Sequence, residues 1–154
     1  MNIFITHKNP EKAARWLAND PKRENRMILE SFQIMYSALR LNGYTGEGYR
    51  LTHKDHPVVL WTAKDVRNML WLYSYTFYLH KQWNKRTGKT HKSYLEHFIK
   101  IGLLINLKNL NVKIQDKNLV NCSMFKKKRN VFKAYRKTLK EKWKEDNKKI
   151  KTNK

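Results

Sequence analysis

TAKDVRNMLWLYSYTFYLHKQWNKR, residues 62–86, is the stretch around which the rest of the chain is expected to pack. It covers about seven helical turns without a proline or a glycine, so no residue in it interrupts helical hydrogen bonding. Apolar residues at i, i+3 and i+4 spacing form one stripe from Val66 to Phe77 and a second from Leu72 to Trp83. A helix that is apolar over so much of its circumference is predicted to lie at the centre of an all-α domain.

The ends of this helix carry recognisable signals. Thr62 and Asp65 resemble a capping box with Asp in the usual Glu position, and Gly88 stands where a left-handed residue would end the helix. We therefore expect the central helix to span about 62–87. Its charges lie at the two ends, and a membrane span needs about 20 nearly uncharged residues. The sequence favours a helix buried in a domain core over a membrane helix.

Composition and charge indicate one basic domain of 154 residues. The chain has 34 Lys and Arg residues against 12 Asp and Glu residues, a formal net charge of +22. Such an excess favours a polyanionic partner, and we expect double-stranded DNA and no membrane. The polar start of the chain does not resemble a secretory signal, and the single cysteine, Cys122, excludes an intrachain disulfide and a cysteine-rich zinc site. We expect a cytoplasmic protein, in the host cytoplasm if a phage encodes it.

Helix signals divide the remaining chain. Asn9-Pro10 and Asp20-Pro21 each pair an N-cap residue with a first-turn proline, and they predict a short helix and a second helix over 21–42 that Gly43 ends. An ordered N-terminal arm is expected over residues 1–8, a loop over 43–56, and another helix from Ser93, where Glu96 completes a capping-box pattern. Residues 106–122 are predicted to be a loop, with a hairpin as the alternative.

The C-terminal segment predicts a basic helix with one packed side. Residues 126–154 contain fourteen Lys or Arg residues and three acidic residues, about half of the formal charge of the chain. An apolar row at helical spacing runs from Phe132 to Trp143, which leaves the other side free for phosphates. The candidate phosphate contacts are Lys126, Lys127, Lys128, Arg129, Lys133, Arg136 and Lys137. We predict one helical DNA-binding domain over 1–147 and a disordered basic tail over 148–154. A solvated charged face is the alternative for this helix.

The start of the second helix is the first candidate site. Lys22, Arg23 and Arg26 crowd a helix N-terminus, where free backbone N–H groups and the helix dipole favour anions. Glu24 lies among these cations, and Glu30, four residues after Arg26, is a candidate buried carboxylate paired with it. The alternative is a capped, solvated first turn with an ordinary i,i+4 ion pair.

Histidines form the second candidate group. His53 and His56 flank Asp55 in the 43–56 loop, and His91 with Lys92 follows the central helix. The spacing lacks a second histidine pair on a helix, so no metal site and no cofactor are predicted. These side chains suit contacts to phosphate, or acid–base work near neutral pH.

Several segments together resemble the phage pyrimidine-dimer DNA glycosylases, the small UV-repair endonucleases. They are LANDPKRENRM at 17–27, HPVVLW at 56–61 and WNKRTG at 83–88. The chain is similar in further patches to uncharacterised phage proteins that begin MNIF, through RMILE at 26–30, GKTHKS at 88–93 and the segment from Ala134 to Trp143. The resemblance extends in patches over about two-thirds of the chain.

The resemblance implies an all-α domain whose N-terminal α-amine attacks C1′ of a damaged nucleotide, forms a Schiff base and nicks the strand by β-elimination. A glutamate early in the second helix would assist, and arginines would hold the phosphates. An α-amine has a pKa near 8, so it supplies a neutral nucleophile at physiological pH. Here Asn2 follows Met1, and Met is normally retained before Asn, so the amine would belong to Met1. Arg23 occupies the family's glutamate position with Glu24 one residue later, which leaves open a one-residue shift or a loss of glycosylase chemistry.

Two main hypotheses follow. In the first, the protein is a DNA glycosylase/AP lyase acting on damaged or modified bases, with Met1 and Asn2 at the catalytic N-terminus and Glu24 or Glu30 as the carboxylate. In the second, it is a non-catalytic phage DNA-binding protein on the same scaffold, used in host takeover or genome protection. An RNA- or ribosome-associated basic protein is a third alternative.

Overall fold

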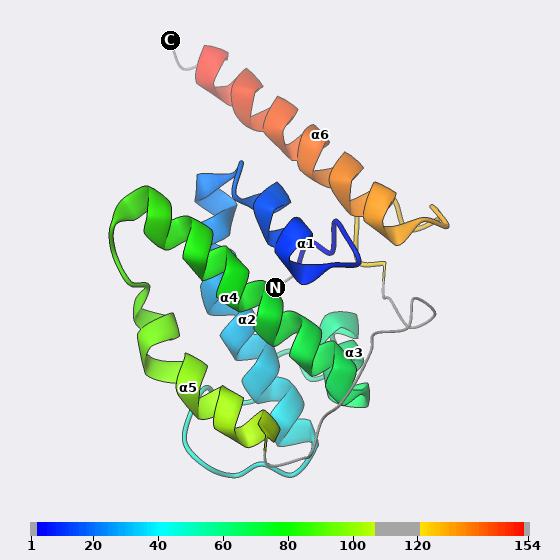
Figure 1. Ribbon diagram of the computed structural model, residues 1–154. Coiled ribbons are helices and arrows are strands. Elements are labelled where there is room, and N and C mark those ends of the chain that lie inside the picture. Colours follow the sequence, from blue (N-terminus) through cyan, green and yellow to red (C-terminus); the bar gives the residue numbers. More distant parts are fainter. Residues whose placement is uncertain (1–2, 107–120, 153–154) are drawn as a thin grey trace.

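The computed structural model describes residues 3–106 and 121–152, and these form one all-α domain without strands (Figure 1). The helices are α1 (Pro10–Leu17), α2 (Pro21–Leu41), α3 (Pro57–Lys64), α4 (Val66–Thr87), α5 (Lys92–Asn106) and α6 (Val131–Thr152). The all-α prediction is confirmed. The predicted loop or hairpin at 106–122 lies almost entirely outside the described residues. Within the described residues, no helix is long and apolar enough to cross a membrane.

The two proline-opened helices begin where the sequence predicts. The side chain of Asn9 accepts a hydrogen bond from the amide of Lys12 at 3.0 Å, and that of Asp20 accepts one from the amide of Arg23 at 3.1 Å. Gly43, with φ of 88°, follows the end of α2 in a left-handed conformation. These caps satisfy amides that the first helical turn leaves without partners.

The predicted central helix differs at its start. Thr62 lies inside α3, where its hydroxyl donates to the carbonyl of Val58 at 2.8 Å. Asp65 is extended, ends α3, and accepts from the amide of Arg67 at 2.8 Å as the N-cap of α4. The predicted Thr62 capping box is therefore wrong, because Asp65 alone caps the helix. At the other end Gly88, with φ of 69°, closes α4 as predicted.

α4 lies against α1, α2, α3 and α5 and contributes the centre of one hydrophobic core (Figure 1). Trp71, Leu72, Tyr75 and Leu79 of α4 are buried. The N-terminal arm joins the same core, since Ile3 and Ile5 are fully buried. Most of the stretch 62–86 forms α4, and this helix is central to the fold, as its apolar pattern predicts.

α5 presents an unexpected surface. Its first turn is capped by His91, whose Nδ1 accepts from the amide of Ser93 at 3.2 Å, so the predicted Ser93–Glu96 capping box is not formed. Ser93 is instead buried, with its hydroxyl 3.1 Å from that of Tyr49. Three apolar side chains of the helix face outward: Leu95, Ile99 and Leu103.

α6 crosses one side of the molecule next to α1 (Figure 1). Tyr135 and Leu139 are fully buried, and the Trp143 ring stacks on that of Trp16 with centroids 6.1 Å apart. These contacts confirm the predicted packed side. The helix continues to Thr152, into the segment 148–154 that is predicted from the sequence to be a disordered tail.

Candidate functional site

The two candidate carboxylates lie on one helix but in different surroundings. Glu24 and Glu30 are six residues apart on α2, which separates them by about 240° around the helix and about 9 Å along it. Glu24 is fully buried, whereas the side chain of Glu30 is 14% exposed. The structure therefore does not combine them into one two-carboxylate site.

Glu24 faces the C-terminal turn of α4. Arg86 donates a hydrogen bond to its Oε2, while its Oε1 has no hydrogen-bond partner among the described residues. Burial raises the pKa of Glu24, and the Arg86 charge opposes that shift. The hydroxyl of fully buried Tyr75, whose own pKa is raised by burial and by the charge of Glu24, likewise has no partner among those residues. Arg86 is thus a functional neighbour of Glu24 that no pattern in the sequence indicated.

Glu30 lies in a more accessible group. Its Oε1 is 3.6 Å from Nη2 of Arg26, whose side chain is 72% exposed, so the predicted i,i+4 pair is confirmed. Burial lowers the pKa of His56, and the negative charge of Glu30 acts in the opposite direction. The His53 ring centroid is 6.5 Å from that of His56. The fold thus gathers an arginine, a carboxylate and two histidines that the sequence presents in two separate stretches.

The loop before α3 is held in place by α2. Nε of Arg40 donates to the carbonyl of Tyr49 at 2.7 Å, and the amide of Thr52 donates to Oγ of Ser37 at 3.2 Å. His53 follows with φ of 51°, a left-handed conformation that is uncommon outside glycine. Nδ1 of His56 accepts from the amide of Val58 at 3.2 Å and caps α3. These hydrogen bonds hold the backbone on both sides of the two histidines.

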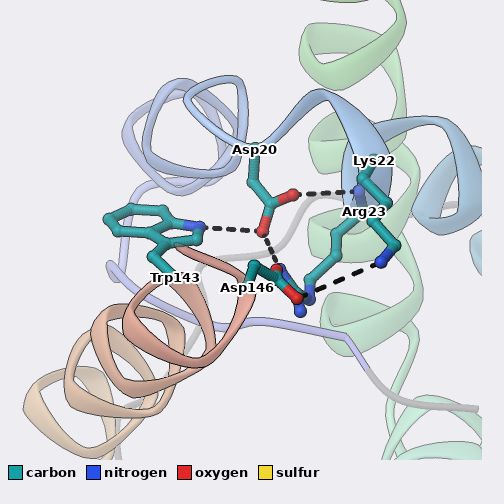
Figure 2. A network of polar contacts seen from close by, with 5 residues as sticks. All are labelled: Asp20, Lys22, Arg23, Trp143 and Asp146. Carbon is teal, nitrogen blue, oxygen red and sulfur yellow. Dashed lines mark hydrogen bonds and ion pairs between the residues drawn. The ribbon is translucent and has the colours of Figure 1, made fainter. Parts of the chain in front are cut away.

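Two of the predicted phosphate-clamp residues lie in a network that joins α2 to α6 (Figure 2). Nη1 of Arg23 is 2.6 Å from Oδ2 of Asp20 and 2.9 Å from Oδ2 of Asp146, and Nε1 of Trp143 donates to Asp20 at 2.8 Å. Arg23 holds the pKa of the Asp146 carboxyl below its usual value. Lys22 is largely exposed, with Nζ 4.0 Å from Asp146. The link of Arg23 to α6 was not predictable from local spacing, because Asp146 is 123 residues away.

His91 and Lys92 lie apart from the histidines of the loop. Burial lowers the pKa of His91, and a hydrogen bond to the backbone of Asn25 opposes that shift. His91 therefore connects the start of α5 to the start of α2. Lys92 is exposed, with Nζ 3.8 Å from Glu96.

The predicted basic residues of the C-terminal segment divide into two groups. Residues 126–129, Lys133 and Lys137 are exposed, and Lys140 and Lys144 continue the exposed row of α6 at spacings of three and four residues. Arg136 faces the fold instead: its Nη1 donates to the carbonyl of Thr6 at 2.9 Å, and its guanidinium lies 5.9 Å from the Trp16 ring centre. One side of α6 holds the domain together and the other carries cations.

Most carboxylates of the described residues are neutralised within the fold. The carboxylates with a basic partner within 4.0 Å are Glu11, Asp20, Glu24, Glu30, Glu47, Asp65, Glu96, Glu141 and Asp146. The exposed cations at 126–129 and at Lys133, Lys137 and Lys140 therefore face solvent or a polyanion, whereas Lys144 of the same row pairs with Glu141 at 3.2 Å. Over 3–106 and 121–152, no group of three or more His, Cys, Asp or Glu side chains is arranged to hold a metal ion.

Comparison with protein-family models, with curated proteins and with solved structures found no significant match to the chain.

Proposed function

We propose that the protein binds DNA and acts on it as a DNA glycosylase/AP lyase through its N-terminal amine. The observation that carries the proposal is the exposed basic row of residues 126–129 and α6, set against a fold in which most described carboxylates already have basic partners. A surface of this kind favours phosphates by releasing condensed counterions from DNA.

For the chemistry, Glu30 is a better carboxylate than Glu24. Glu24 is fully buried against Arg86, whereas Glu30 is partly accessible and lies near His56. Exposed Arg26 adjoins Glu30 and suits a phosphate of the bound strand. We therefore assign Glu30 the proton-transfer role and Arg26, His53 and His56 supporting contacts.

The proposed reaction begins at the α-amine of Met1. Met1 and Asn2 lie outside the described residues, but they directly precede buried Ile3, and two residues span at most about 7 Å. The amine nitrogen forms a bond to C1′ as the C1′–N bond breaks and the base leaves with a proton. The C1′–O4′ bond then breaks, O4′ takes up a proton from water, and the nitrogen lone pair forms the protonated Schiff base. This iminium makes the C2′ proton acidic; its removal by Glu30 forms a C2′=C3′ double bond as the C3′–O bond breaks and the 3′-phosphate leaves.

A second candidate is a DNA-binding protein without catalysis, and the positions of Arg23 and Glu24 favour it. Both residues match the segment that resembles the glycosylase motif, yet Arg23 is committed to Asp20 and Asp146, and Glu24 to Arg86. A scaffold that uses these positions for stability retains DNA affinity without strand cleavage.

Borohydride trapping on a duplex with one abasic site, run beside a gel shift on the same DNA, separates the two candidates. The lyase proposal expects a covalent protein–DNA adduct that disappears when the N-terminus is acetylated. Glu30→Gln should slow nicking by at least tenfold, since general acid–base groups contribute about 10²–10⁴-fold. Glu11→Gln is the matched control because Glu11 also pairs with an arginine four residues away, at 2.6 Å, on an exposed helix face. A gel shift without an adduct or a nick would leave the binding protein as the function.

A further inference from the structure

The turn before α6 has an unusual combination of side chains. Residues 121–130 run NCSMFKKKRN, and no Asp or Glu occurs between Lys117 and Lys140. Met124 is 57% exposed, and four consecutive exposed cations begin at Lys126. We call residues 121–130 the basic turn. A large apolar side chain is thus presented to solvent next to a cluster of positive charge.

The basic turn is internally bonded. The side-chain amide of Asn121 donates to the carbonyls of Phe125, Lys126 and Lys128 at 3.1, 3.2 and 3.3 Å. Its Oδ1 accepts from the amide of Ser123 at 3.1 Å, and Oγ of Ser123 accepts from the amide of Phe125 at 3.1 Å. One polar network centred on Asn121 and Ser123 therefore fixes the backbone that carries Met124 and the lysines.

The turn is also fixed to α6. The amide of Cys122 donates to the hydroxyl of Tyr135 at 3.0 Å, and the amide of Met124 donates to Oγ1 of Thr138 at 3.1 Å. Tyr135 and Thr138 are both buried. A turn that is already ordered loses less conformational entropy when it binds a partner.

A shallow depression that is open to solvent, about 600 Å³ in volume, is lined by Met124, Phe125 and residues 126–128. The Phe125 ring lies half-buried, with Nζ of Lys137 4.3 Å from its centre. Apolar and aromatic surface with adjacent ammonium groups matches a nucleotide, whose base has an apolar face and whose phosphate is anionic. Tyr135 and Leu139 of α6 are buried in the core, and Ile150 is the large apolar side chain that the helix exposes, so α6 presents no continuous apolar face to a membrane surface.

We propose that Met124 and Phe125 contact an unstacked base of the bound nucleic acid while residues 126–129 hold the flanking phosphates. This inference rests on the proposed DNA binding and specifies how part of that surface is used. It predicts a preference for DNA with an unpaired or unstacked base over intact duplex, because an apolar contact to a base face needs the base to leave its stack.

The test measures affinity for an intact duplex, the same duplex with one unpaired base, and a single strand, each over a range of salt concentrations. Met124→Ser and Phe125→Leu should each weaken binding to the last two DNAs by about 5- to 100-fold, the range of one lost base contact, with the salt slope unchanged. Lys127→Gln should instead weaken binding to all three and reduce the slope on duplex by about 0.9. Leu95→Ser, which removes another exposed apolar side chain, is the control and should bind as the wild type does.

The outcomes distinguish this inference from the proposed function. If Met124→Ser and Phe125→Leu bind all three DNAs like the wild type while Lys127→Gln weakens binding, DNA binding stands and the base contact is refuted. If the wild type binds none of the DNAs but binds vesicles containing phosphatidylserine, and Met124→Ser reduces that binding, both proposals are overturned in favour of a membrane contact. Circular dichroism of each variant verifies that it is folded.

Discussion

Replacing Asp20 tests the network that joins α2 to α6. Asp20 is 5% exposed, and its carboxylate caps α2, pairs with Arg23 and accepts from Trp143. Asp20→Ala removes a cap worth about 1 kcal/mol and a charged hydrogen bond worth about 1.5–3 kcal/mol. Arg23 keeps Asp146 as a partner, so its charge is not left uncompensated. We expect the free energy of unfolding to fall by about 3 kcal/mol.

Asp20→Asn is the matched variant, because Asn is an equally good N-cap and still offers an oxygen to Trp143. It should cost about 1–2 kcal/mol, the part that depends on the negative charge beside Arg23. Urea unfolding followed by tryptophan fluorescence measures both changes, since Trp143 stacks on Trp16 in the folded state. Equal losses in the two variants would refute the capping contribution, and losses below about 0.5 kcal/mol in both would refute the network as a source of stability.

Three other changes have defined outcomes. Burial lowers the pKa of His91 in the folded state, so the unfolded state binds more protons, and the free energy of unfolding should fall as the pH drops through the unfolded pKa of about 6.5. His91→Asn keeps a cap acceptor and should show a flatter pH profile in urea unfolding. An unchanged profile would contradict this prediction. Arg86→Ala leaves the buried charge of Glu24 without a partner and should lower the free energy of unfolding by about 3 kcal/mol at pH 7. Without Arg86 the pKa of Glu24 is raised further, so this loss of stability should shrink as the pH falls and Glu24 takes up a proton. A loss that does not depend on pH would refute the charge argument. Gly48→Ala places a Cβ 2.1 Å from the Tyr36 ring, at a backbone φ of 131°. It should lower the melting temperature far more than Gly88→Ala, whose added Cβ has no atom within 4 Å and which should reduce stability by about 1 kcal/mol. Equal shifts in melting temperature would show that the loop around Gly48 moves freely.

Local signals in the sequence predict local structure well. Asn9 and Asp20 cap helices as expected because an N-cap acts within three residues of itself. The central helix is predicted to start at Thr62, whereas α4 starts after Asp65; both residues have cap chemistry, and the choice between them depends on the extended backbone at Asp65. His91 acts as a cap although histidine is not among the preferred residues, so propensity alone did not indicate it.

In the candidate site, contacts within one helix were predictable from the sequence, whereas contacts between distant residues were not. The Arg26–Glu30 pair follows from helical spacing and was predicted. Arg23 and Asp146 are 123 residues apart in the sequence, and Glu24 and Arg86 are 62 apart. No local periodicity encodes pairs this distant. Those contacts change the assignment of both residues, because a side chain engaged inside the fold is less free for phosphate or substrate.

The placement of α6 also determines when the domain can be completed during synthesis. The first described residues, Ile3 and Phe4, are buried, and Phe4 packs edge-on against Tyr135 at 6.3 Å between ring centres. A ribosome therefore has to synthesise the chain as far as Tyr135 before Phe4 can acquire this cover. Until α6 is in place, the nascent protein lacks the cover that Tyr135 gives Phe4 and that Trp143 gives Trp16, and such exposed apolar surface attracts chaperones and favours aggregation. A truncation before residue 131 would remove Tyr135, Leu139 and Trp143, and leave that surface permanently open.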